Sequence, residues 1–295
     1  MKKHLLLFAA ALAALLAGCV TVPSMEEQAR AELFTLLRTT EAWAQIHAAE
    51  ELCHAGILSN ETTEIYEKAY AASEPRTPYR IGCIRVLYRN CPEKRNALRE
   101  ELLSNAFDPS SPAAIHAVET IGKLGLLLSP EELARLKPYL GQKNPLDEYG
   151  IMPFVLAGDM EGVAEWRRRL EAGNQYAACL GTYVDELPEY CHEALEATRH
   201  QAGGSEVFRM AAFQSYLRNC DITNADHAEL WKRVETCSDG IRRFYIQAVG
   251  DIGDEKDGRR LMKYLEDADP EIRIATAGSV IRIANRCALI GNARK

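Results

Sequence analysis

The feature that most constrains this chain is a helical pattern that recurs along nearly its whole length. Short amphipathic segments follow one another two by two, separated by turn residues such as those at 73–78, 108–112 and 267–270, and no run of strict alternation predicts a strand. The second segment of each pair starts with an apolar residue, followed by small and apolar residues at helical spacing. These starts lie 27 to 36 residues apart, at Ile46, Ile81, Ile115, Tyr149, Tyr176, Phe208, Phe244 and Ile272.

A period of about 30 to 40 residues with two helices per unit is typical of an α-solenoid. Each helical hairpin has an apolar face that it cannot bury alone, so stability comes from the stacking of neighbours. Small residues should let successive second helices approach closely, and they occur at Ala48, Ala49, Ala117, Ala211 and Ala277. We therefore expect an all-α protein, a right-handed superhelix of about eight hairpins that forms one domain over residues 25–292.

Three segments carry a resemblance to a known family. IHAAEEL at 46–52 and DPEIRIA at 269–275 look like the second-helix start of HEAT repeats, and AVGDIGD at 248–254 looks like their Gly-Asp exit. The chain thus resembles HEAT-repeat proteins, including the HEAT-like repeats of bilin lyases, which implies a concave surface lined by the second helices. Tetratricopeptide repeats are the competing interpretation, but their fixed period of about 34 residues and their Trp/Gly/Tyr pattern are missing.

The first residues predict export and lipidation. Lys2 and Lys3 precede an apolar stretch at 5–16, which is shorter than the roughly 20 residues of a spanning helix, and Leu-Ala-Gly-Cys follows at 16–19. This tetrad resembles the lipobox of bacterial lipoproteins, which implies that residues 1–18 are a signal peptide and that Cys19 is lipidated at the start of a tether over 19–24. Val20 follows Cys19 at the position where a signal for retention at the inner membrane would resemble Asp, so placement in the outer membrane is favoured. We expect a lipid-anchored envelope protein that faces the periplasm.

The charge of the chain argues against nucleic acid as a partner. The formal net charge is −7, and no stripe of Lys and Arg interleaved with aromatic residues occurs. Because the neutralisation of phosphates supplies most of the affinity for nucleic acid, we expect none to bind. The expected partner is a protein or a peptide, with a glycan as a further alternative.

Two equivalent second helices carry a His-x-x-Glu pattern, His47 with Glu50 and His116 with Glu119. At this spacing the two side chains share one helical face. Three interpretations stay open: a metal site, a charge ladder in which Arg80 or Arg85 pairs with the glutamates between repeats, and a binding patch. Some HEAT-type hydroxylases hold iron with adjacent His-Glu pairs, but here only His192-Glu193 is adjacent. We predict a binding patch on the first three repeats, made by Trp43, His47, Glu50, Arg80, Arg85, His116 and Glu119.

No catalytic residue, cofactor or metal ligand is predicted. The sequence has no Gly-rich phosphate loop, no G-x-S-x-G and no H-E-x-x-H. An interaction protein is therefore favoured, and the alternatives are a HEAT-fold enzyme, either a lyase or a metal-dependent hydroxylase, and a purely structural envelope protein.

Eight cysteines follow Cys19, and none forms the C-x-x-C unit of a zinc site. An exported chain meets an oxidising compartment, so some of them could pair. Cys191 and Cys220 fall at hairpin ends that should be close, and Cys53 and Cys91 fall near the ends of adjacent second helices. These are the two predicted disulfides.

Overall fold

The computed structural model describes residues 23–141, 146–184, 187–201 and 203–293, with side chains up to residue 289. Within these ranges every regular element is a helix and no strand occurs, which confirms the all-α prediction. Among the described helices, none combines the length and the apolar run that crossing a bilayer would need. The predicted signal peptide and Cys19 lie outside the described residues.

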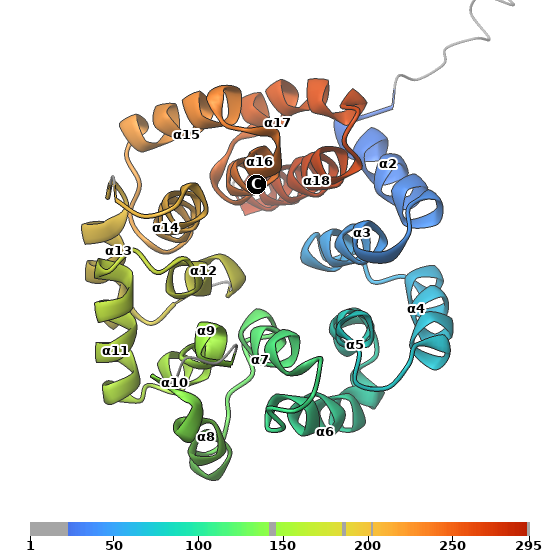
Figure 1. The fold of residues 1–295 in the computed structure, drawn as a ribbon. Coiled ribbons are helices and arrows are strands. Elements are labelled where there is room, and N and C mark those ends of the chain that lie inside the picture. Colours follow the sequence, from blue (N-terminus) through green and yellow to red (C-terminus); the bar gives the residue numbers. More distant parts are fainter. Residues whose placement is uncertain (1–22, 142–145, 185–186, 202, 294–295) are drawn as a thin grey trace, which may run out of the picture.

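The helices form two concentric layers (Figure 1). The outer layer contains α2 (Met25–Thr39), α4 (Asn60–Ala72), α6 (Arg95–Ala106), α8 (Pro130–Leu136), α11 (Met160–Glu171), α13 (His192–Thr198), α15 (Asn224–Thr236) and α17 (Glu255–Leu261). Four short 3-10 segments adjoin these outer helices: η1 (Pro92–Lys94), η2 (Lys137–Tyr139), η3 (Glu189–Cys191) and η4 (Met262–Glu266).

The inner layer contains α3 (Ala42–His54), α5 (Pro78–Asn90), α7 (Ala114–Lys123), α9 (Leu146–Gly150), α12 (Gln175–Tyr183), α14 (Glu206–Asn219), α16 (Asp239–Ile252) and α18 (Pro270–Ala293). The short α10 (Met152–Leu156) follows α9 directly. Pro153 stands in the first turn of α10, where it cannot donate to a preceding carbonyl, and this accounts for the break between the two helices. All eight predicted starts lie in inner-layer helices.

The two layers close into a ring instead of an open superhelix. The last helix, α18, packs against both helices of the first hairpin, α2 and α3 (Figure 1). A closed ring has no open concave groove, so the surface expected to face a partner becomes the wall of a central channel.

Local signals explain where the helices begin. Ser24 and Ser129 accept from the backbone N–H three residues on, while Glu27 and Glu132 accept from the backbone N–H of the serines, so both helices start with a capping box. Such reciprocal bonds satisfy amide groups that the first turn of a helix leaves without intrahelical partners. The starts of these two helices are therefore fixed by local hydrogen bonds of the capping residues.

Small residues hold the inner helices close together. The five alanines singled out from the sequence are all fully buried. A Cβ at Gly250 of α16 would collide with the Ser279 side chain of α18, and a Cβ at Gly278 of α18 would collide with Glu51 of α3. The closest approach of α18 to its two inner-layer neighbours thus requires glycine.

Candidate functional site

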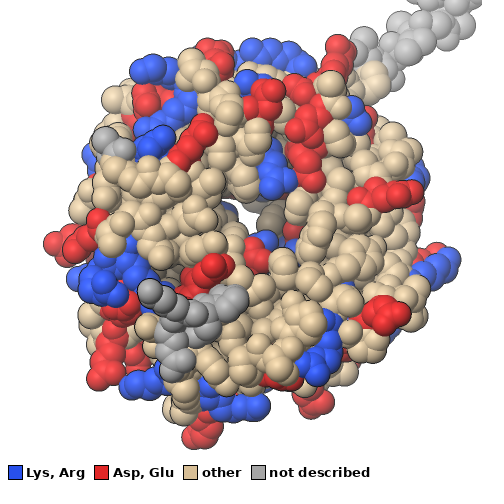
Figure 2. Space-filling view, viewed as in Figure 1, with Lys and Arg blue, Asp and Glu red and all other residues tan. Residues whose placement is uncertain are grey.

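A channel runs through the middle of the ring, and an opening is visible at its centre (Figure 2). It consists of two cavities of about 410 and 790 Å³ that share part of their lining. We call the smaller cavity the aromatic lobe, the larger one the cationic lobe, and the shared residues the waist. The waist consists of Glu51, His54, Arg89, Lys123, Thr182, Tyr183, Gln214 and Gln247.

The direction of the inner helices decides which side chains reach each lobe. Residues near the starts of these helices line the aromatic lobe, among them Trp43, His116 and Phe244. Residues near their ends line the cationic lobe, among them Arg89 and Arg218. Because the C-terminal end of a helix carries partial negative charge, Lys and Arg in the last turns are favourable there. Part of the positive charge of the cationic lobe therefore stabilises the C-terminal ends of the inner helices.

The aromatic lobe contains six of the seven residues predicted as a binding patch: Trp43, His47, Glu50, Arg85, His116 and Glu119. The rings of Trp43 and His116 stack with their centroids 5.6 Å apart. His47 is in contact with Glu271 of α18, with Nδ1 2.8 Å from a carboxylate oxygen. Three successive inner helices thus bring these side chains together, and the ring closure adds a residue from the far end of the chain.

Charged side chains link α3, α5 and α7 in what we call the Glu50 ladder. Arg85, only 1 % exposed, donates through Nε to Glu50 and through Nη1 to Thr120 Oγ1 at 3.0 Å. Glu119 of α7 pairs with Lys123 at 3.0 Å and accepts from the Tyr183 hydroxyl of α12 at 2.9 Å. The alternative of pairing between neighbouring repeats therefore holds for Arg85 and Glu50.

These contacts keep the carboxylates charged. Burial acts to raise the pKa of Glu50, but the nearby Arg85 and Lys123 more than offset it, and the pKa falls to about 2. Burial acts in the same way on Glu119, whose pKa Lys123 and His116 hold well below its usual range. Both side chains are therefore anions at neutral pH.

Arg80 is the one residue of the predicted patch that the structure places away from the channel. Its guanidinium lies over the Tyr70 ring at 3.8 Å, donates to the Tyr70 carbonyl at 2.7 Å and pairs with Glu101 of α6, and it lines neither lobe. Five residues separate it from Arg85, which is about 140° around a helix. Arg80 thus faces the outer layer, whereas Arg85 of the same helix faces the channel and the neighbouring inner helices.

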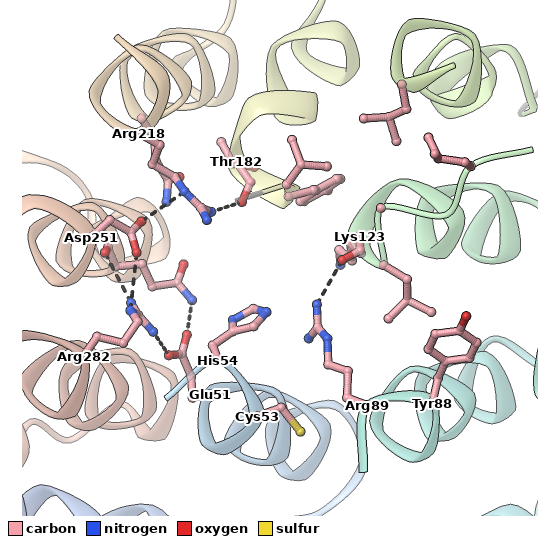
Figure 3. A pocket seen from close by; sticks show the side chains of 18 of the residues that line it. Glu51, Cys53, His54, Tyr88, Arg89, Lys123, Thr182, Arg218, Asp251 and Arg282 are labelled. Atoms are coloured by element: carbon pink, nitrogen blue, oxygen red, sulfur yellow. Dashed lines mark hydrogen bonds and ion pairs between the residues drawn. The ribbon is translucent and has the colours of Figure 1, made fainter. Parts of the chain in front are cut away.

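A second set of contacts, which we call the Glu51 ladder, was not anticipated from the sequence (Figure 3). Glu51 of α3 pairs with Arg282 of α18, whose Nε lies 3.3 Å from Asp251 of α16. Asp251 also lies 3.5 Å from Arg218 of α14, and Arg218 donates to the Thr182 carbonyl of α12. The available signal was the recurrence of charged residues near the ends of successive second helices.

His54 was also missed, and it projects into the cationic lobe from the end of α3 (Figure 3). Its ring is exposed to the channel, yet protein surrounds the channel on all sides. Burial within the ring, followed by the nearby charges of Arg89 and Arg282, lowers the pKa of His54 well below its usual range. The imidazole is therefore neutral at pH 7.

Neither predicted disulfide is present, and the eight cysteines after Cys19 are free thiols. Cys53 Sγ accepts from Asn90 Nδ2 at 3.0 Å inside the ring, whereas Cys91 Sγ lies 4.0 Å from Thr63 of α4. Cys220 Sγ lies 3.8 Å from the His192 carbonyl oxygen. Burial raises the pKa of Cys53 to about 11, so this thiol in the channel is protonated.

The described residues bring no three His, Cys, Asp or Glu side chains together in a way that could hold a metal ion. His47 and His116, the histidines of the two His-x-x-Glu patterns, contact Glu271 and Glu119 respectively. No protein-family model matches the chain, and no curated protein or solved structure matches it either.

Proposed function

We propose that this chain is a binding lipoprotein of the bacterial envelope that takes a peptide segment into its central channel. The observation that carries the proposal is the channel: an aromatic lobe and a cationic lobe that meet at a waist inside a closed ring. The resemblance to HEAT repeats, the right-handed winding and the lipid anchor at Cys19 are part of the same proposal. They rest on the sequence patterns described above.

The dimensions of the channel favour an extended ligand over a folded partner. Cavities of about 410 and 790 Å³ are in the range that encloses small ligands, far below the volume of a folded domain. An extended peptide offers a thin chain with alternating polar groups and side chains. Aromatic side chains such as Trp43 and Phe244 supply contact area for such a ligand at little cost in conformational entropy.

A substitution that fills the channel tests this function. His54 projects into the cationic lobe, so His54→Trp should obstruct the passage without removing a contact of the wall, and His200→Trp is the same change at an exposed position outside the channel lining. Native mass spectrometry of protein extracted from native membranes should find a bound peptide on the wild type and on His200→Trp, and none on His54→Trp. A wild type without any bound species, or equal occupancy of both variants, would favour a purely structural envelope protein.

The anchor requires a separate experiment. Cys19→Ala should move the protein from the membrane fraction to the soluble periplasmic fraction, because the acyl chains that hold it can no longer be attached. Intact-mass analysis of the native protein should show a lipid adduct on a chain that begins at Cys19. An unmodified cysteine, or a retained signal peptide, would contradict the anchor.

A further inference from the structure

The proposed function leaves open which chemical group of a peptide the channel recognises. The pairing of the cationic side chains in the channel lining reduces the number of candidate groups. Five of the seven Lys and Arg side chains that line the channel pair with a carboxylate: Arg85 with Glu50, Lys123 with Glu119, Arg218 with Asp251, Arg243 with Glu271 and Arg282 with Glu51. Within the described part of the chain, Arg89 and Arg95 have no such partner. Arg95 lies exposed at the rim, over the Tyr88 ring at 5.5 Å.

Arg89 occupies a different position, at the waist between the two lobes. Its Nη2 donates to the Lys123 carbonyl oxygen at 2.9 Å, and Figure 3 shows the side chain extending from the end of α5 toward Lys123. A guanidinium carries five N–H donors, so this bond leaves most of them for another acceptor. Its planar fork matches a carboxylate, which it can bind through two parallel hydrogen bonds.

Gln214 of α14 provides a second observation about the ligand of the waist. Its side chain is 3 % exposed and lines both lobes, and its Oε1 is buried without a hydrogen-bond partner. A buried polar atom without a partner destabilises a protein unless a ligand completes it. A side-chain amide both donates and accepts, so it complements a peptide group, which also offers one donor and one acceptor.

Resting on the proposed function, we propose that the waist captures the free C-terminus of a peptide. Arg89 binds the terminal carboxylate, and Gln214 binds the adjacent peptide group. The preceding side chains lie in the aromatic lobe, against apolar groups such as Met210, Phe244 and Ile274. The surplus of one unpaired guanidinium at the waist matches the single charge of a carboxylate.

The competing explanation is that Arg89 only caps the C-terminal end of α7, where Lys and Arg are favourable in any helix. A cap contributes to stability and has no preference among ligands. A free carboxylate and its amide differ in charge while sharing the same shape, so this pair of ligands separates the two explanations.

The experiment compares N-acetyl-Ala-Ala-Phe with its C-terminal amide by isothermal titration calorimetry on the full mature protein. The wild type should bind the acid about tenfold more tightly than the amide, as expected for one charge-assisted pair. Arg89→Gln should abolish this preference, and Arg89→Lys should retain only part of it because the fork is lost. Arg95→Gln, the matched change at the rim, should retain it fully.

Gln214→Leu provides a readout that a merely structural role would not produce. It removes a buried amide oxygen that has no partner in the protein, so the melting temperature should stay the same or rise while the affinity for the acid falls. A fall in both would indicate that the amide supports the fold.

Equal binding of acid and amide by the wild type would overturn C-terminal capture, and so would a preference that survives in Arg89→Gln. If the protein still carries a bound species that His54→Trp removes, the channel function would remain and only this inference would fail. If neither peptide binds and no native species is found, both would fail.

Discussion

The two ladders of the channel begin on neighbouring residues of α3 and run around the ring in opposite directions. The Glu50 ladder passes through Arg85 to α7, and Glu119 of α7 then reaches Tyr183 of α12. The Glu51 ladder passes through Arg282 and on to α16 and α14, and it reaches Thr182, also on α12. Between them they connect nearly every inner helix.

The difference between the ladders lies in how far apart their partners are in the chain. Glu50 and Arg85 are separated by 35 residues, which is one repeat, whereas Glu51 and Arg282 are separated by 231. The first ladder would also form in an open superhelix, since it joins consecutive hairpins. The second requires the ring to be closed, so its energy is available only after the first and last hairpins have met.

The largest effect is expected where the Glu51 ladder joins the two ends of the ring. The Glu51 and Arg282 side chains are 4 % and 14 % exposed, and Glu51→Ala would leave the guanidinium without this partner. Removing one partner of a buried pair is strongly destabilising, so we expect the free energy of unfolding to fall by about 4 kcal/mol in urea titrations. Hydrogen exchange should rise first in α2 and α18.

The control for this prediction is Glu61→Ala, which removes an exposed pair with Arg38 on the outer layer. Its unfolding midpoint should stay at the wild-type value, because exposed pairs contribute little. If Glu51→Ala behaved like Glu61→Ala, the closure would not depend on this ladder.

A pH-dependent effect of intermediate size is expected in the Glu50 ladder. Because the pKa of Glu50 falls from 4.5 to about 2 on folding, its contribution is fully present above pH 4.5 and is lost as the pH falls through 2. A shift of this size corresponds to roughly 3 kcal/mol. The difference in unfolding free energy between the wild type and Glu50→Gln should therefore shrink as the pH falls from 4.5 to 2. A difference that stays constant over this range would contradict the prediction that folding lowers the pKa of Glu50.

The smallest effect is expected outside the channel, at Arg80. Arg80→Ala removes hydrogen bonds to Glu101 and to the Tyr70 carbonyl, which should lower the free energy of unfolding by about 2 kcal/mol. Occupancy of the channel per folded molecule should not change, because Arg80 lines neither lobe. A loss of ligand at unchanged stability would return Arg80 to the binding patch.

What the sequence predicts well is whatever recurs from one hairpin to the next. The apolar starts of the second helices predicted every inner helix, and the His-x-x-Glu pattern led to the aromatic lobe. The orientation of single side chains was less accessible: Arg80 and Arg85 share a helix, but only the position of α5 between the outer layer and the channel decides which of them faces inward. Arg282 illustrates the other limit, because no local pattern indicates that its partner is on the first hairpin.

The closure of the ring also sets the width of the passage. In an open superhelix each hairpin can tilt slightly against the next, so the pitch can adapt to the shape of a bound partner. In a closed ring the last hairpin packs against the first, so a tilt of one hairpin has to be accommodated by all the others, and the width of the bore varies less. A ligand that passes through such a bore is selected by its cross-section before any side chain recognises its chemistry.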